Sequence, residues 1–333
     1  MADQHRPHNG TAPLSPAEVR SCASAFERIA AGVGTTVLGK PHVVRLALTA
    51  LLAEGHLLVE DVPGVGKTTL ARAMAAVVRG AWRRIQFTPD LLPSDVTGVT
   101  IFNQASRSFE FHQGPIFANI VIADEINRAS PKTQSALLEV MEEGFVTVDG
   151  VRHPVPRPFL VVATQNPVEM DGTYRLPEAQ LDRFLMKLSV GYPDEAVEVD
   201  VLRGAVAGRS PDALEPITDT AAISHAIGLA RRVYLADPLY AYAVRLAAAT
   251  RNHPQVRVGV SPRGGIALTR AASAFALLDG RNYVVPEDLQ TLVEPVFAHR
   301  LLLSPDAQLR GATASAVLDG VLDQVPVPSA QPV

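Results

Sequence analysis

The 333-residue sequence contains a single cysteine, no long apolar run and no block of like charges. Because Cys22 is alone, the sequence excludes an intramolecular disulfide and a zinc site built from cysteines. No uninterrupted apolar stretch reaches the length of a membrane span. Residues 1–15 are polar, with Pro and Gly, and lack the apolar segment of a secretory signal. These absences predict a cytoplasmic protein without a membrane span.

Charge and histidine content limit the partners that we expect. The 30 Lys and Arg residues are balanced by 34 Asp and Glu residues, which gives a formal net charge of −4. Because no basic block is present, we expect no nucleic-acid partner. The nine His residues are scattered without metal-ligand spacing, so none is predicted to bind a metal. The hydrophobic content of 47% supports a substantial core, in one large domain or two ordinary ones.

The most informative stretch is residues 60–69, which read Glu-Asp-Val-Pro-Gly-Val-Gly-Lys-Thr-Thr. A short apolar strand at 56–59 precedes it and a helix-like segment at 70–78 follows, which is the context of a phosphate-binding P-loop. Loop N–H groups and the helix N-terminus would face the phosphates. Lys67 would reach the β- and γ-phosphates, and the Thr68 hydroxyl would ligate Mg²⁺.

This stretch departs from the strict P-loop pattern at one position. The pattern requires Gly five residues before Gly66, where this sequence has Asp61. The glycines nearest the phosphates are kept, so we interpret the stretch as a P-loop rather than as a Gly-rich turn that binds nothing. The predicted nucleotide-binding residues are Asp61, Val62, Pro63, Gly64, Val65, Gly66, Lys67, Thr68 and Thr69.

A second candidate site follows the β-branched run at 120–123, which predicts a buried parallel strand. This run ends in Asp124 and Glu125. A carboxylate at the carboxyl end of a strand next to the P-loop would hold Mg²⁺ or its water, so Asp124 is the predicted metal ligand. Glu125 would orient and activate the attacking water. Taken alone, the pair could equally be two solvated acids.

Three further polar residues could complete a phosphoryl-transfer site. Asn166 follows a third apolar run at 159–164 and could hydrogen-bond the γ-phosphate or the water, although a turn-forming Asn before Pro has the same pattern. Arg183 and Arg263 could supply positive charge to the γ-phosphate in the transition state. From spacing alone, an ordinary surface arginine is the better interpretation of each.

The pattern of segments predicts an α/β core followed by a helical lid. Strands alternate with helices up to about residue 189, and Ala- and Leu-rich helical segments dominate after Pro193. Runs at 99–112 and 145–153 predict two hairpins, the second with Asp149-Gly150 at its turn. The predicted parts are a disordered arm at 1–16, an α/β P-loop core at 17–192, an all-helical lid at 193–310 and a C-terminal segment at 311–333 that ends in a Pro-rich tail.

Taken in order, these motifs resemble those of an AAA+ ATPase. Four stretches are similar to the MoxR family in particular, at 60–68, 124–129, 163–167 and 176–184. The resemblance covers roughly residues 20–305. It implies a parallel sheet flanked by helices, ATP and Mg²⁺ as cofactors, and assembly into a ring, expected to be a hexamer.

The resemblance also assigns roles to the candidate residues. It implies a Walker A motif at 61–68 and a Walker B motif at Asp124 and Glu125. It further implies sensor 1 at Asn166, an arginine finger at Arg183 and sensor 2 at Arg263. Arg128 is the alternative residue that could act across a subunit boundary.

The activity implied is that of an ATP-hydrolysing, chaperone-like remodeller of partner proteins. Partners of this family often carry a von Willebrand factor A domain, which would have to be a separate protein here. The 99–112 hairpin is the candidate docking surface, because it contains Ile101, Phe102, Phe109 and Phe111. Two alternatives remain open: a nucleic-acid motor, which would favour more basic hairpins, and a nucleotide-dependent binding module without hydrolysis, which would favour loss of Glu125. A GTPase is disfavoured, since no Asn-Lys-x-Asp motif is present.

Overall fold

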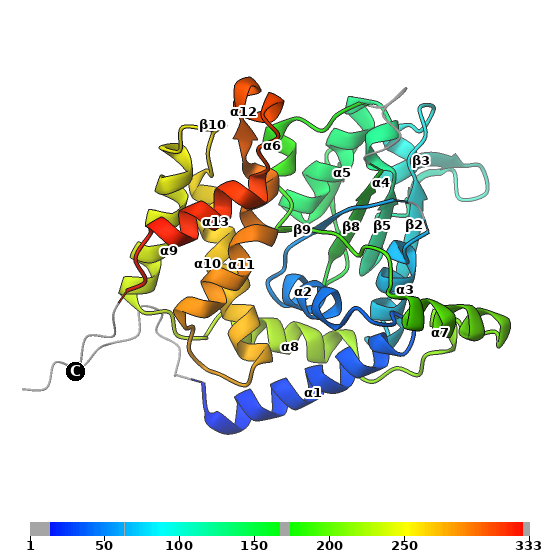
Figure 1. Cartoon of the computed structure of the whole chain (residues 1–333). Helices are drawn as coiled ribbons and strands as arrows, with labels where there is room; N and C mark the ends of the chain where they lie inside the picture. Colours follow the sequence, from blue (N-terminus) through cyan, green and yellow to red (C-terminus); the bar gives the residue numbers. More distant parts are fainter. Residues whose placement is uncertain (1–13, 63, 167–173, 329–333) are drawn as a thin grey trace, which may run out of the picture.

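The computed structural model describes residues 14–62, 64–166 and 174–328 (Figure 1). A five-stranded sheet lies at the centre of the α/β core, in the order β2-β5-β8-β1-β9. Its strands are β1 (Leu57–Glu60), β2 (Trp82–Gln86), β5 (Ile120–Asp124), β8 (Leu160–Gln165) and β9 (Met186–Leu188).

Every neighbouring pair in this sheet is parallel. The carboxyl ends of the strands therefore lie along one edge and the amino ends along the opposite edge. We call these the carboxyl edge and the amino edge. Because β8 lies between β5 and β1, whatever follows these three strands is brought together at the carboxyl edge.

The central strands are buried on both faces, as expected for a parallel sheet covered by helices. Alternate residues enter different clusters: Ile122 packs with the helices on one face, and Val121 and Ala123 pack with those on the other. The first face is covered by α1 (Pro16–Gly34), α2 (Pro41–Leu52) and α3 (Lys67–Val77), and the second by α5 (Pro131–Glu143).

Both predicted hairpins are confirmed. The first, β3 (Gly98–Asn103) with β4 (Ser108–Gln113), follows the short helix α4 (Pro93–Thr97) and lies beside β2 in Figure 1. The second pairs β6 (Phe145–Val148) with β7 (Val151–Pro154). The ring of Phe111 stacks on His153 with centroids 4.1 Å apart, so the two hairpins are in contact.

The lid is mainly helical, and its part from residue 237 onward lies on the β9 side of the sheet in Figure 1. It also contains a short antiparallel ladder between β10 (Val256–Val258) and β11 (Leu302–Leu303), so it is not entirely helical. Its helices are α7 (Glu195–Val206), α8 (Thr220–Ala230), α9 (Asp237–Arg251), α10 (Pro262–Leu278), α11 (Pro286–Phe297), α12 (Pro305–Leu309) and α13 (Ala314–Gln324). The core also contains the short helix α6 (Glu178–Leu181) and the 3-10 turn η1 (Ile126–Arg128). The lid also contains the 3-10 turns η2 (Pro211–Ala213) and η3 (Ala298–Arg300).

Packing continues from the core into the lid without a break. Helix α2 packs against α8 and α10, and one hydrophobic cluster contains residues of both parts. Helix α13 packs against α9 and α11 through buried Val317, Leu318 and Val321, which adds a helix from beyond the predicted lid boundary at 310. Of the predicted N-terminal arm, residues 1–13 lie outside the described residues, and α1 begins at Pro16. Within the described ranges, no helix is both long enough and apolar enough to span a bilayer.

Candidate nucleotide-binding site

The predicted P-loop connects β1 to α3 at the carboxyl edge, and α3 begins at Lys67. Gly64 and Gly66 have φ values of +86° and +94°, which favour glycine, and a Cβ at either position would meet open space. No side chain caps the N-terminus of α3. Its first N–H groups are therefore suited to an anion in the open space before the loop. Pro63 lies outside the described residues.

Lys67 and Asp61 contact each other within the loop. The Lys67 Nζ atom donates a hydrogen bond of 2.8 Å to the main-chain oxygen of Asp61. The Asp61 carboxylate instead accepts hydrogen bonds from Ser189, Val190 and Gly191. Asp61 is therefore part of the loop, as predicted, but its charged group faces the segment after β9.

Asp124 ends β5 and is held from two sides. The Thr164 hydroxyl donates to its Oδ1 atom at 2.5 Å, and the Arg84 Nη2 atom donates to Oδ2 at 2.6 Å. Thr164 also accepts a hydrogen bond from the Glu125 N–H at 2.9 Å. One hydroxyl on β8 thus fixes both predicted Walker B residues.

Glu125 follows with a φ of 55°, in the left-handed region that residues other than glycine seldom adopt. Its Oε2 atom accepts hydrogen bonds from Gln86 and from Arg128, both at 3.0 Å. Arg128, the alternative finger, is therefore paired with a carboxylate of its own chain at the carboxyl edge.

Asn166 directly follows β8 and is only 5% exposed. Because β8 separates β1 from β5, Asn166 follows the strand between the P-loop and Asp124. The Asp61 N–H donates to the Gln165 oxygen at 3.2 Å, which ties the P-loop to this strand end. The structure thus brings the P-loop, Asp124, Glu125 and Asn166 to one edge.

The oxygen groups at this edge suit Mg²⁺ with a nucleotide. Thr68 lies in the first turn of α3, and Asp124 ends a strand of the same edge. A hydroxyl and a carboxylate are ligands that Mg²⁺ accepts, with waters and phosphate oxygens completing its shell. The Arg84 side chain that contacts Asp124 is 50% exposed, so this ion pair is a weak surface contact that a metal ion could replace.

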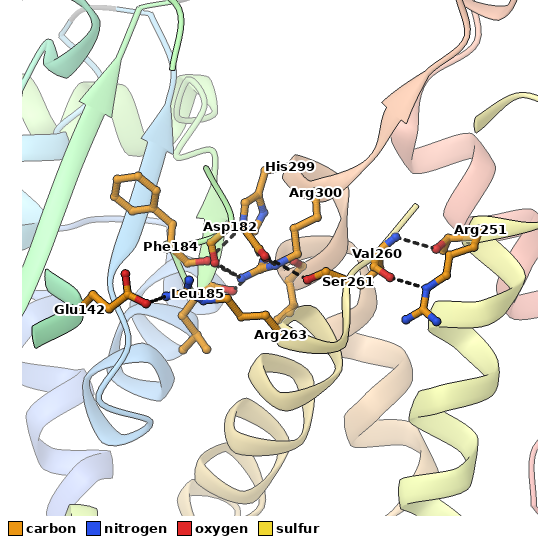
Figure 2. A network of polar contacts seen from close by, with 12 residues as sticks. Glu142, Asp182, Phe184, Leu185, Arg251, Val260, Ser261, Arg263, His299 and Arg300 are labelled. Carbon is orange, nitrogen blue, oxygen red and sulfur yellow. Dashed lines mark hydrogen bonds and ion pairs between the residues drawn. The ribbon is translucent and has the colours of Figure 1, made fainter. Parts of the chain in front are cut away.

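Arg183 and Arg263 lie at the opposite edge. Arg183 precedes β9 and Arg263 is in the first turn of α10. Both contact Glu142 at the end of α5, each at 3.2 Å (Figure 2 labels Arg263 and Glu142). The structure therefore brings the two predicted arginines together but separates them, by the length of the sheet, from their own P-loop.

A buried arginine joins the core to the lid beside this pair. Figure 2 shows Arg300 beside Asp182 and Phe184 of the core, and Ser261 of the lid close by. The Arg300 Nε atom donates to Asp182 at 2.7 Å, its Nη2 atom donates to the Phe184 oxygen at 2.6 Å, and the Ser261 hydroxyl donates to Asp182 at 2.9 Å. Residues 182–184, which include Arg183, are thereby fixed to the N-terminus of α10.

A cleft of about 290 Å³ opens at the amino edge. Six arginines line it against three acidic residues, Glu54, Glu142 and Asp182, so positive charge is in excess. The arginines are Arg157, Arg183, Arg231, Arg263, Arg270 and Arg300. An excess of guanidinium groups favours an anion at this surface.

Sequence reasoning missed several residues of both edges. Thr164 lies within a motif stretch, two residues before Asn166, and could have been found there. Gln86, Arg84, Glu142 and Arg300 carry no local signal, because their partners are 39, 40, 41 and 118 residues away along the chain.

The parallel sheet has the strand order β2-β5-β8-β1-β9 and is followed by a helical lid. The P-loop follows β1, the Asp-Glu pair lies at the end of β5, and a polar residue follows β8, which lies between them. Together these features define an AAA+ ATPase fold. Two family models agree: the ATPase family associated with various cellular activities matches residues 56–186, and the AAA lid domain matches residues 248–321.

Similar proteins identify the family within this class. The chain is 41% identical to chaperone MoxR1 of Mycobacterium tuberculosis, over 91% of this chain and 82% of that protein. It is 34% identical to protein MoxR of Paracoccus denitrificans, over 92% and 97%. A crystal structure from Cytophaga hutchinsonii, provisionally assigned as an ATPase, superposes with a TM-score of 0.88 at 35% identity, over 93% and 97% of the two chains. The chain belongs to the MoxR family of AAA+ ATPases.

Proposed function

We propose that this protein hydrolyses ATP to ADP and phosphate at the carboxyl edge of its sheet. The observation that carries the proposal is the convergence of Lys67, Asp124, Glu125 and Asn166 after three adjacent strands. Lys67 and the α3 N-terminus would bind the phosphates, and Thr68 and Asp124 would hold Mg²⁺. The metal, when bound, would neutralise charge on the β- and γ-phosphates.

The attacking water would be oriented by Glu125 and Asn166. Glu125 would accept a proton from the water while the water oxygen bonds to the γ-phosphorus. The bond between the γ-phosphorus and the oxygen that bridges it to the β-phosphorus would break, so that ADP leaves. Gln86 and Arg128 hold the Glu125 carboxylate and would have to leave one lone pair free for this proton. A carboxylate has about four acceptor sites, so two donors leave room for a water.

We further propose that the site is shared between subunits. Arg183 and Arg263 lie at the amino edge, so they are better placed for the γ-phosphate of a neighbour than for that of their own chain. The excess of arginine around them supports an anionic partner. Such a contact closes head to tail into a ring, for which we propose a hexamer.

Glu125→Gln is the variant that tests hydrolysis. It keeps the shape and loses the base, so we expect nucleotide binding to remain and turnover to fall by about 10²-fold or more. Phosphate release is measured with Mg²⁺ and ATP, and binding with a fluorescent ATP analogue. Wild-type turnover in the variant would remove Glu125 from the mechanism.

The ATP cycle is proposed to remodel protein partners, including proteins with a von Willebrand factor A domain. Support comes from the name of the M. tuberculosis relative, which is a chaperone, and from the exposed hairpin β3–β4. On that hairpin, Phe109 is 74% exposed, and Ile101 and Phe102 are each 49% exposed. Phe111 is half-buried against Phe117 and His153, so it is removed from the proposed surface. The cytoplasmic location remains a prediction.

A further inference from the structure

Asp61 stands where the strict P-loop motif has glycine, and the structure shows that this position does not require one. Gly64 and Gly66 occupy the left-handed region, whereas Asp61 is not among the residues with positive φ. The backbone can therefore carry a side chain at position 61 without strain.

The Asp61 carboxylate is almost completely enclosed, since the residue is 9% exposed. Its Oδ2 atom accepts hydrogen bonds from the Gly191 N–H at 2.6 Å, the Val190 N–H at 2.7 Å and the Ser189 hydroxyl at 3.0 Å. Its Oδ1 atom accepts from the Val62 N–H at 2.9 Å. Burial by itself raises the pKa of Asp61, but these donors together keep the pKa below its ordinary value. The group is therefore a charged acceptor with short, strong hydrogen bonds.

The donors belong to the segment that joins the sheet to the lid. We call residues 189–194 the linker, because β9 ends at Leu188 and α7 begins at Glu195. The linker is also held by the Lys40 Nζ atom, which donates to the Tyr192 oxygen at 2.8 Å, and Asp194 at its end caps α7 by accepting from the Val197 N–H.

The main chain of Asp61 contacts residues of the proposed nucleotide site. Its oxygen accepts the hydrogen bond from Lys67, and its N–H donates to the Gln165 oxygen, next to Asn166. A single residue thus bonds the phosphate-binding lysine through its backbone and the lid linker through its side chain. A glycine at this position would keep the first contact and lose the second.

We propose that Asp61 is a positioning residue that couples nucleotide binding at the P-loop to the linker of the lid. This inference rests on the proposed function, because it needs ATP at Lys67. A phosphate bound beside Lys67 changes the loop to which Asp61 belongs, and the carboxylate carries that change to residues 189–191. Coupling of this kind is reciprocal, so the position of the linker also changes the affinity for ATP.

The experiment compares hydrogen exchange of the linker in full-length wild type, Asp61→Gly and Asp61→Asn, with and without a non-hydrolysable ATP analogue and Mg²⁺. In wild type we expect the analogue to change linker exchange by about fivefold or more, the usual lower range of a coupling. Asp61→Gly should speed linker exchange and abolish the response, while still binding the analogue. Its kcat should fall more than its KM rises.

Two variants separate coupling from simple loosening. Ser189→Ala removes one of the three linker donors and should reduce the response in part. Lys40→Ala loosens the linker at Tyr192 without touching Asp61, so its linker should exchange faster but still respond. If Asp61→Gly does not fold, Asp61→Asn and Ser189→Ala carry the test.

Failure of this inference differs from failure of the proposed function. A wild type that does not bind the analogue contradicts both. Analogue binding without a linker response in wild type contradicts the coupling alone. An unchanged response in Asp61→Gly also overturns it, and so does an unchanged response in both Asp61→Asn and Ser189→Ala.

Discussion

Lys67 is the residue on which nucleotide binding depends most directly. In the structure Lys67 is the first residue of α3, and its ammonium group donates to the main-chain oxygen of Asp61 in the loop. The ammonium group therefore lies near the N-terminus of α3. Lys67→Ala should weaken ATP binding by about 10- to 100-fold, because hydrogen bonds to charged groups contribute about 1.5–3 kcal/mol each. Titration with a fluorescent ATP analogue measures the change.

The matched control for this variant is Lys132→Ala. Lys132 is an exposed lysine on α5, so its removal changes the net charge equally without touching the loop. Equal affinity in Lys67→Ala and Lys132→Ala would contradict nucleotide binding at residues 61–69.

At this scale the sequence predicts the carboxyl edge far better than the amino edge. Asp124 ends β5, Asn166 directly follows β8, and Lys67 follows β1 after a short loop, so their meeting point follows from parallel topology alone. The contacts of Glu142 with Arg183 and Arg263 depend on how α5, β9 and α10 pack. No local pattern encodes that packing.

Among the elements, β1, β8 and α5 are joined by one buried histidine. The Val161 N–H donates to His56 Nδ1, so the ring proton lies on Nε2 and is donated to the Met141 oxygen, both at 3.0 Å. Burial lowers the pKa of His56 to about 4, and the charge of Arg270 contributes in the same direction. The ring is therefore neutral in the folded protein at neutral pH.

This histidine predicts a loss of stability in mild acid. Between pH 6.5 and about 4 the unfolded chain binds a proton at His56 that the folded chain does not, so stability falls as the pH falls through this window. The loss at the acid end is about 3 kcal/mol by linkage. Burial also shifts the pKa of His299 downward, which adds to the same trend. Urea unfolding at several pH values measures it, with His56→Gln as the non-titrating variant.

The control is the difference between the two pH profiles. His56→Gln should be less stable than wild type at pH 7 and should show a shallower decline toward pH 4. Parallel profiles for the two proteins would mean that His56 does not titrate differently in the folded and unfolded states.

The hairpin β3–β4 predicts a separable partner surface. Phe102 and Phe109 contact each other with ring centroids 5.2 Å apart and remain largely exposed. Replacing both with Ser should leave basal ATPase close to wild type, since neither ring is in the core. In a Glu125→Gln background with ATP, it should abolish co-purification of proteins with a von Willebrand factor A domain. His112→Ala, an exposed change on the same hairpin, is the control.

Equal recovery of such partners by the Ser variant would make the hairpin structural. The docking surface would then have to lie elsewhere, for which the lid is the next candidate. Loss of binding in both the Ser variant and the His112→Ala control would indicate a general disturbance of the hairpin.

Elements with strong local chemistry could be predicted, and those without it could not. The second hairpin turns at Asp149 and Gly150, both with positive φ, which the Asp-Gly pair predicts. The ladder of β10 and β11 is only two or three residues long on each strand, too short for an alternation pattern.

For the whole molecule, the two edges of the sheet must meet in an assembly if the site is to be complete. The structure separates the Lys67 edge from the edge that carries Arg183 and Arg263. A cationic finger contributes about 10³–10⁵ in turnover, so Arg183→Ala and Lys67→Ala should each be nearly inactive alone. In the proposed ring, a mixture of the two variants would place the intact arginine of one subunit beside the intact P-loop of the other, and should recover ATPase activity.

A second mixture decides on which side Arg263 acts. If Arg183 and Arg263 serve the same neighbouring site, Arg183→Ala mixed with Arg263→Ala leaves every amino edge defective and recovers nothing. If Arg263 served its own chain, that mixture would recover activity. An Arg263→Ala subunit would then supply its Arg183 to the site of an Arg183→Ala neighbour, which keeps its own Lys67 and Arg263. Arg263→Ala mixed with Lys67→Ala should recover activity only in the first case. Phosphate release from mixtures shown to co-assemble by differential tagging therefore distinguishes a two-arginine shared site from a single trans-acting finger, and no recovery in any mixture would contradict sharing itself.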